Sequence, residues 1–178
     1  MRIGILGGSF DPPHYGHKKI SLHAKNFFGL QQFWWLVTPH NPFKDKNSIA
    51  EFQVRFSHCQ DFVRGSQIKI LDLEKKIGSS YSFETIAYLL RRYPNHEFYY
   101  FIGADNLVQF HKWKKFSQII RKVKLVVYDR DQNMHKALRS RFALEYKRYR
   151  CNFVNRPLLK SKTPPYWQYV AFPKVDVS

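Results

Sequence analysis

Short apolar segments alternate with longer amphipathic segments along this chain, and this alternation limits its fold more than any other feature. The apolar segments have the length of strands, and the amphipathic ones are long enough to be helical crossovers. Strands joined in this way form a parallel sheet with helices on both faces. We expect an α/β fold with strands over 2–6, 32–37, 68–73, 98–102, 124–128 and 166–172, and helices over 14–28, 50–63, 82–93, 105–121 (in two pieces) and 132–149.

Two helix ends carry local signals of their own. Gly29 follows the first helical segment, and glycine readily adopts the left-handed backbone that ends a helix. Ser82 precedes an amphipathic segment that stops before Pro94, and serine is a favoured N-terminal cap. We therefore expect Gly29 and Ser82 to be caps.

Size, charge and cysteine content narrow the class of protein. The 178 residues suffice for one domain spanning 1–178, and 44% apolar residues exclude a disordered chain. Lys and Arg number 30 against 13 Asp and Glu, so the net charge of +17 favours polyanionic partners such as nucleotides or nucleic acid. Cys59 and Cys151 are too few for a disulfide framework or a zinc cluster. No segment has the roughly 18 apolar residues of a membrane span or the pattern of a signal peptide, so we expect a cytoplasmic protein.

Three loops stand where a parallel sheet binds its ligands. Such sheets bind outside the carboxyl ends of their strands, at the point where the strand order reverses. The loops after Leu6, Val37 and Ile102 are therefore the places to look for function.

The loop after the first strand has the features of a phosphate site. Gly7 and Gly8 let the backbone approach a ligand, and the helix that follows offers unpaired N–H groups and a positive dipole end. His14 and His17 are three residues apart, so both imidazoles share one face of the first turn and can donate to phosphate oxygens. No further metal ligand stands at suitable spacing beside them, so we expect no metal to be held by the protein itself.

This loop also carries a family resemblance. Residues 8–17 run Gly-Ser-Phe-Asp-Pro-Pro-His-Tyr-Gly-His. They resemble the His-x-Gly-His signature of the nucleotidyltransferase superfamily, in the longer form typical of bacterial nicotinate-nucleotide adenylyltransferases. The resemblance implies a Rossmann-like nucleotidyltransferase fold. It also implies adenylyl transfer from ATP to nicotinate mononucleotide, which gives deamido-NAD and pyrophosphate in NAD biosynthesis.

The resemblance extends to other loops and implies a role for particular residues. Residues 38–44 resemble the family's proline loop ending in a basic residue, 81–85 its Tyr-x-x-Asp-Thr motif, and 103–113 its Gly-Ala-Asp…Trp block. Mg²⁺ is implied as a cofactor that is bound through the ATP phosphates with few protein ligands. By this resemblance the catalytic residues are His14, His17 and Lys44; ATP is bound by Gly7, Gly8, Ser9, Phe10, His14, His17 and Asp105; nicotinate mononucleotide is bound by Lys44, Thr85, Trp113 and Lys114.

The chain departs from the family pattern in two places. The residues Val175-Asp176-Val177-Ser178 resemble the opening of a second phosphate-binding signature, whose Thr and Arg do not follow. We expect that motif to be cut off after Ser178. Tyr128-Asp129-Arg130 stands where the family usually has Arg-Pro-Gly, which puts the adenine contacts in doubt.

Two other functions remain open from the sequence. One is a different His-x-Gly-His transferase, of the phosphopantetheine or glycerol-phosphate type. The other is a nucleic-acid-binding module, because the basic region 139–162 has aromatic residues interleaved at Phe142, Tyr146 and Tyr149. The oligomeric state is not indicated by any pattern.

Overall fold

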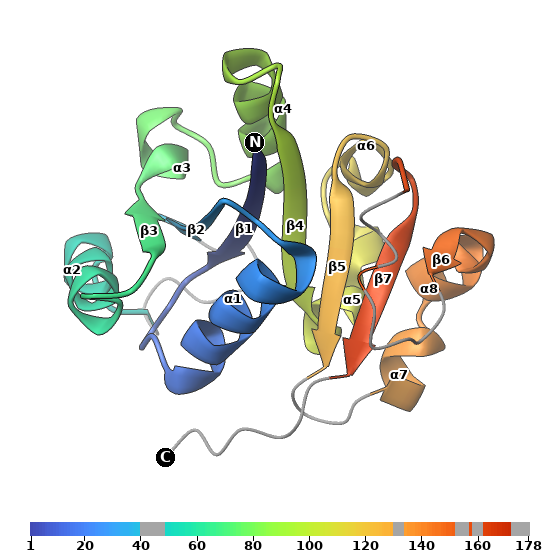
Figure 1. Cartoon of the computed structure of the whole chain (residues 1–178), viewed down its shortest axis with the longest axis horizontal. Helices are drawn as coiled ribbons and strands as arrows, with labels where there is room; N and C mark the ends of the chain where they lie inside the picture. Colours follow the sequence, from blue (N-terminus) through green and yellow to red (C-terminus); the bar gives the residue numbers. More distant parts are fainter. Residues whose placement is uncertain (40–48, 130–133, 152–156, 158–161, 172–178) are drawn as a thin grey trace.

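Seven parallel strands form one sheet in the order β3-β2-β1-β4-β5-β7-β6 (Figure 1). The computed structural model describes residues 1–39, 49–129, 134–151, 157 and 162–171. The sheet order reverses at β1, because β2 pairs on one side of it and β4 on the other. The strands are β1 (Arg2–Gly8), β2 (Gln32–Val37), β3 (Ile68–Leu71), β4 (Glu97–Gly103), β5 (Lys124–Asp129), β6 (Arg150–Cys151) and β7 (Trp167–Ala171).

Helices cover both faces of this sheet. In Figure 1, α1 crosses in front of the sheet, while α4 and α5 lie behind it. The core on one face contains residues of α1 and α2, and the core on the other contains residues of α4 to α8. The helices are α1 (Tyr15–Phe28), α2 (Phe52–Phe62), α3 (Leu73–Lys76), α4 (Ser82–Arg92), α5 (Ala104–Gln109), α6 (Phe116–Ile120), α7 (Met134–Leu138) and α8 (Arg141–Glu145), with 3₁₀ turns at Phe110–Lys112 and Lys147–Tyr149.

Strand β2 shows how the sheet divides these two cores. Trp34 and Leu36 belong to the core under α4 to α8, and Phe33, Trp35 and Val37 belong to the core under α1 and α2. Successive strand residues point to opposite faces, so a continuous apolar run fills both. The apolar strands expected from the sequence are thus central strands buried on both sides.

Most expected elements are confirmed within a few residues, and the first helix ends at Gly29 as predicted. Gly29 has a left-handed backbone with φ of 59°, and its N–H donates to the Asn26 carbonyl. The strand expected over 68–73 ends at Leu71, because α3 begins at Leu73. The short elements α3 and β6 were not expected.

Two expectations about helices are wrong. The helix expected over 132–149 is divided, because Ser140 caps a new helix by accepting a hydrogen bond from the Ala143 N–H at 3.4 Å. Ser82 does not cap α4: Tyr81 holds the cap position, and the Ser82 hydroxyl instead accepts a hydrogen bond from the Tyr100 hydroxyl at 2.9 Å.

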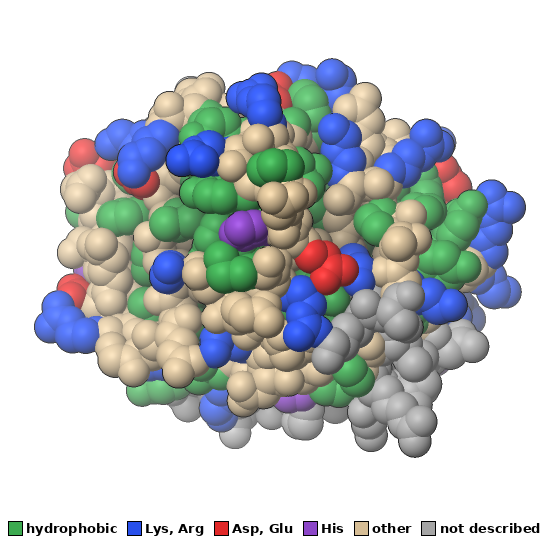
Figure 2. Space-filling model, turned by 45° about the horizontal axis from the view of Figure 1, so that its top comes forward, with side chains coloured by type: hydrophobic (Ala, Val, Ile, Leu, Met, Phe, Trp, Pro, Cys, Tyr) green, Lys and Arg blue, Asp and Glu red, His purple; other side chains and the backbone are tan. Residues whose placement is uncertain are grey.

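The surface is strongly basic, in keeping with the net charge. Figure 2 shows Lys and Arg side chains spread over the visible face, with a few Asp and Glu among them. Cys59 and Cys151 are both free and buried. Among the described residues, no helix is long and apolar enough to cross a membrane.

Candidate active site

A cavity of about 740 Å³ opens at the carboxyl ends of β1 and β4, where the strand order reverses. This volume is in the range of pockets that hold nucleotide-sized ligands. All three predicted loops contribute to its wall, so the cavity lies where the sequence predicts the site. The predicted site residues that line it are Gly7, Gly8, Ser9, Phe10, His14, His17, Asp105, Trp113 and Lys114.

Two stacked imidazoles stand at the start of α1. The ring centroids of His14 and His17 are 3.6 Å apart, with 29° between the ring planes. The backbone N–H of His14 donates to His17 Nδ1 at 3.3 Å. Because Nδ1 accepts, a neutral His17 ring carries its proton on Nε2. The pair therefore offers ring donors next to the positive end of a helix of 14 residues.

The Phe10 ring packs against His17 and helps to fix the position of its imidazole. Its ring stacks on Trp35 at 4.6 Å and meets the His17 ring edge-on at 5.0 Å. Its backbone has a φ of +49°, in the left-handed region that bulky residues rarely adopt. The packing of the buried Phe10 ring, which is 3% exposed, offsets the free-energy cost of this backbone conformation.

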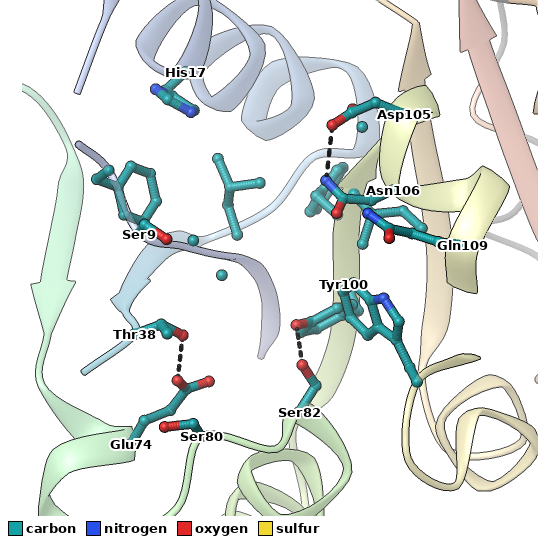
Figure 3. A pocket seen from close by; sticks show the side chains of 18 of the residues that line it. Ser9, His17, Thr38, Glu74, Ser80, Ser82, Tyr100, Asp105, Asn106 and Gln109 are labelled. Atoms are coloured by element: carbon teal, nitrogen blue, oxygen red, sulfur yellow. Dashed lines mark hydrogen bonds between the residues drawn. The ribbon is translucent and has the colours of Figure 1, made fainter. Parts of the chain in front are cut away.

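Ser9 adds a hydroxyl beside these rings. It is 8% exposed, and its Oγ has no hydrogen-bond partner among the described residues. Figure 3 shows this oxygen directed into the cavity. A buried hydroxyl costs free energy unless it is hydrogen-bonded, so Ser9 is suited to contact a polar ligand.

Polar side chains of α5 form the opposite wall. Figure 3 shows Asp105, Asn106 and Gln109 across the cavity from His17. Asn106 Nδ2 donates to Asp105 Oδ2 at 3.3 Å. A Cβ on Gly103 would lie 2.2 Å from Asp105 Oδ1, so only glycine lets the carboxylate fold back over the end of β4. Asp105 can accept hydrogen bonds from ligand hydroxyls in this position.

Trp113 and Lys114 lie at one end of the cavity. The buried Nε1 of Trp113 has no hydrogen-bond partner among the described residues. Lys114 Nζ lies 4.1 Å from the centre of the Tyr81 ring and 3.5 Å from Glu84 Oε1. An indole face and a cation thus stand together where an aromatic anion could bind.

Thr85 is buried and is not among the residues that line the cavity. Its backbone N–H donates to the Tyr81 carbonyl at 3.2 Å, and its hydroxyl lies 3.5 Å from Glu74 Oε1. The backbone N–H of Thr85, a residue that the resemblance assigns to nicotinate mononucleotide, is therefore already engaged by the helix. Lys44 and the part of the proline loop after Pro39 lie outside the described residues, as do residues 172–178 with the partial second motif.

Sequence reasoning missed several polar residues of the wall. Glu74 is 2% exposed and accepts a hydrogen bond from the Thr38 hydroxyl. Tyr100 is buried in β4, and its hydroxyl would lie 3.1 Å from a Cβ on Gly7. No local signal marks Glu74, because it looks like a solvated residue beside Lys75 and Lys76. Tyr100 could have been noticed as a hydroxyl within an apolar strand.

Tyr128 lines the cavity at the end of β5, where the sequence departs from the family pattern. Its hydroxyl makes a 2.7 Å hydrogen bond with His23 Nδ1. Asp129 is buried and accepts a hydrogen bond from the Tyr169 hydroxyl at 2.7 Å. Arg130 lies outside the described residues.

None of the described residues of the basic region 139–162 lines the cavity wall. Phe142 is 0% exposed and Tyr146 is 8% exposed, because both pack in the core. Neither can stack on a base, so the expected aromatic part of a nucleic-acid surface is wrong for these two residues. A contact through charge alone stays a prediction.

Comparisons with known proteins agree with this geometry. A family model described as cytidylyltransferase-like matches residues 5–167. A protein of Bradyrhizobium sp. strain ORS 278, named probable nicotinate-nucleotide adenylyltransferase, is 39% identical over 100% of this chain and 93% of its own length. A protein of the same name from Ruegeria pomeroyi is 40% identical over 99% of this chain and 82% of its own.

A solved structure shares the fold. Plasmodium falciparum nicotinic acid mononucleotide adenylyltransferase, in complex with NaAD, matches with a TM-score of 0.71. The match covers 98% of this chain and 77% of that chain at 19% sequence identity. At this identity the likeness establishes the fold alone.

The buried carboxyl of Glu74 predicts a pH dependence of stability. Burial raises the pKa of Glu74 above its ordinary value of 4.5, while hydrogen bonds from Thr38 and Thr85 oppose this. The folded state thus holds the proton more tightly than the unfolded state. The stabilising contribution of Glu74 is complete below pH 4.5 and is lost as the pH rises through the folded pKa.

We therefore expect Glu74→Gln to be tolerated best at neutral pH. The free energy of unfolding of the variant, relative to the natural chain, should fall as the pH is lowered toward about 4.5. Urea denaturation across this pH range measures the trend, and Glu145→Gln, at an exposed acid of α8, controls for the loss of one negative charge. A relative stability that rises with falling pH would contradict the prediction.

Proposed function

This chain belongs to the cytidylyltransferase-like family and, within it, to the nicotinate-nucleotide adenylyltransferases, and we propose that it transfers the adenylyl group of ATP to nicotinate mononucleotide. The products are deamido-NAD and pyrophosphate. The observation that carries the proposal is the stacked His14–His17 pair at the start of α1, facing a cavity at the point of strand reversal. Family membership selects this reaction from among those such a site could perform.

The reaction needs no nucleophile from the protein. A phosphate oxygen of nicotinate mononucleotide attacks the α-phosphorus of ATP, a new P–O bond forms, and the bond to the bridging oxygen of the β-phosphate breaks. The electron pair leaves with pyrophosphate. Catalysis then consists of positioning the two nucleotides and stabilising the charge that develops on the phosphates.

His14 and His17 are the residues we assign to this charge. Their rings stand beside the N-terminus of α1, where helix N–H groups and the dipole already favour an anion. The hydrogen bond from the His14 N–H leaves the proton of a neutral His17 ring on Nε2, which can donate to a phosphate oxygen. Ser9 offers a further hydroxyl beside them.

The other end of the cavity suits the pyridine nucleotide. Trp113 can stack on the pyridine ring, and Lys114 supplies positive charge for the carboxylate. Asp105 can accept from ribose hydroxyls. Lys44 remains our proposal for a further phosphate contact, on the strength of the sequence resemblance alone.

The donor set of the wall fits Mg²⁺ bound mainly by phosphate oxygens. Among the described residues, the carboxylates that line the cavity are those of Asp11, Glu74 and Asp105, which come from three different segments. The described residues contain no cluster of three His, Cys, Asp or Glu that could hold a metal ion. When bound, Mg²⁺ supplies charge neutralisation to the phosphates.

Replacement of His17 tests the assignment of the histidine pair. Removing a donor directed at developing charge should lower kcat by about 10²–10³-fold, so we expect this loss for His17→Ala. Pyrophosphate release measures it, with a thermal melt to show that the variant is folded. His58→Ala, at an exposed histidine of α2, is the matched control. A near-normal kcat would remove His17 from the mechanism.

The identity of the second substrate is tested by comparing nicotinate mononucleotide with nicotinamide mononucleotide. A site built to pair a carboxylate rejects the neutral amide, so we expect kcat/KM to favour the acid by about 10²-fold or more. Pyrophosphate release with ATP and each mononucleotide measures the ratio. Equal kcat/KM for the two mononucleotides would contradict the preference for the acid. If neither mononucleotide gave pyrophosphate release, the proposed reaction would be wrong.

A further inference from the structure

Arg55 is a buried cation directly behind the first two loops of the site. It lies in α2 and is 2% exposed. Its guanidinium donates to four backbone carbonyls: Nε to Ala50 at 2.7 Å, Nη1 to Ser9 at 2.6 Å and to Thr38 at 3.0 Å, and Nη2 to Pro39 at 3.2 Å. Neither composition nor motif marks this arginine out from the other basic residues.

The four acceptors come from three separate parts of the chain. Ser9 follows β1, Thr38 and Pro39 follow β2, and Ala50 precedes α2. The loop after β1 is thereby tied to the loop after β2 by one side chain. The two loops also meet directly, since the Thr38 N–H donates to the Gly8 carbonyl at 2.9 Å.

Only an arginine side chain suits this position. The planar guanidinium presents five N–H groups in fixed directions, and all four hydrogen bonds to the carbonyls are donated by these groups. A lysine ammonium has three donors at a single point and cannot reach carbonyls on opposite sides. These hydrogen bonds do not neutralise the positive charge of Arg55, because the carbonyl oxygens that accept them carry no net charge.

The positive charge of Arg55 is not cancelled by a carboxylate in contact with it among the described residues. Burial lowers the pKa of Arg55, and the negative charge of Asp11 opposes that shift. Asp11 itself accepts a hydrogen bond from the Ala50 N–H at 2.8 Å. The charge of the guanidinium thus stands behind the backbone of a loop that faces the cavity, partly offset by Asp11.

The hydrogen bond from Arg55 to the Ser9 carbonyl affects the histidine pair through Phe10, the next residue in the chain. Phe10 adopts the left-handed backbone next to the Ser9 carbonyl, and its ring contacts His17 at 5.0 Å. The position of the His17 ring therefore depends on a loop conformation that Arg55 holds from behind. A displacement of about 1 Å at a reacting centre can cost about 10²-fold in rate.

We propose that Arg55 is a positioning residue for adenylyl transfer: it fixes the loops after β1 and β2 in their catalytic arrangement and adds a buried positive charge behind the triphosphate site. It touches no reacting atom, since it acts through the Ser9, Thr38 and Pro39 carbonyls. The inference rests on the proposed function and adds a residue that the family resemblance does not assign here.

Arg55→Lys and Arg55→Met separate the two parts of this role. Arg55→Lys keeps the charge and loses the planar guanidinium, so kcat should fall by about 10²-fold with a smaller change in KM for ATP. Arg55→Met loses both, so its KM for ATP should rise further than in Arg55→Lys, and a non-hydrolysable ATP analogue should bind it more weakly in calorimetry. Arg64→Lys and Arg64→Met, at an exposed arginine just after α2, are the matched controls and should leave kcat and KM unchanged.

Thermal melts of each variant accompany the kinetics. A cooperative melt above the assay temperature, together with the expected loss of kcat in Arg55→Lys, supports the proposal. A kcat within about threefold of the natural chain in a folded Arg55→Lys overturns it. Failure of both variants to fold also overturns it, because Arg55 would then serve the core and not the site.

Failure of the proposed function has a different signature. In that case the natural chain releases no pyrophosphate from ATP and nicotinate mononucleotide, whatever stands at position 55. Calorimetry with the ATP analogue still tests Arg55, because weaker binding to Arg55→Met than to Arg64→Met does not depend on the second substrate. Equal affinity of these two variants for the analogue contradicts the electrostatic part of the proposal.

Discussion

The site depends first on the divergence of the chain on either side of β1. Strand β2 pairs with one edge of β1, and β4 pairs with the other. The crossover that follows β1 and the crossover that follows β4 therefore leave in opposite directions. No helix can cover the carboxyl ends of β1 and β4 at that point, and a cavity remains there. The first loop, the start of α1 and the start of α5 all border it, which brings segments distant in sequence to one ligand.

We propose that three sources of attraction for phosphate, one of them contributed by α2, meet at the loop after β1. Backbone N–H groups at the start of α1, two imidazole rings and a buried guanidinium all act on the same side of the cavity. Contacts within the protein hold the imidazole rings and the guanidinium in place. Preorganised donors stabilise developing charge without a cost of reorganisation during the reaction. We propose that this preorganisation promotes adenylyl transfer, a reaction that needs no nucleophile from the protein.

The sequence alone could predict what is local. The strands are continuous apolar runs, so the sheet could be predicted. The histidine pair, the glycines and the helix start lie within a few consecutive residues, so the loop that borders the cavity could be predicted too, while its role in binding phosphate stays a prediction. Arg55 and Glu74 were not, because the burial of a charged side chain depends on carbonyls or hydroxyls supplied by other segments. Thr38, for example, meets Arg55 through its carbonyl and Glu74 through its hydroxyl. The division at Ser140 was missed because a basic, helix-forming composition concealed a residue that begins a second helix.

The central claim is that the imidazole pair after β1 holds the phosphates of ATP while a second nucleotide binds near Trp113. The most direct measurement is a crystal structure of this chain with a non-hydrolysable ATP analogue. The account predicts phosphate oxygens within hydrogen-bonding distance of the His14 and His17 rings, at the N-terminus of α1. An analogue bound with its phosphates away from both rings would contradict it.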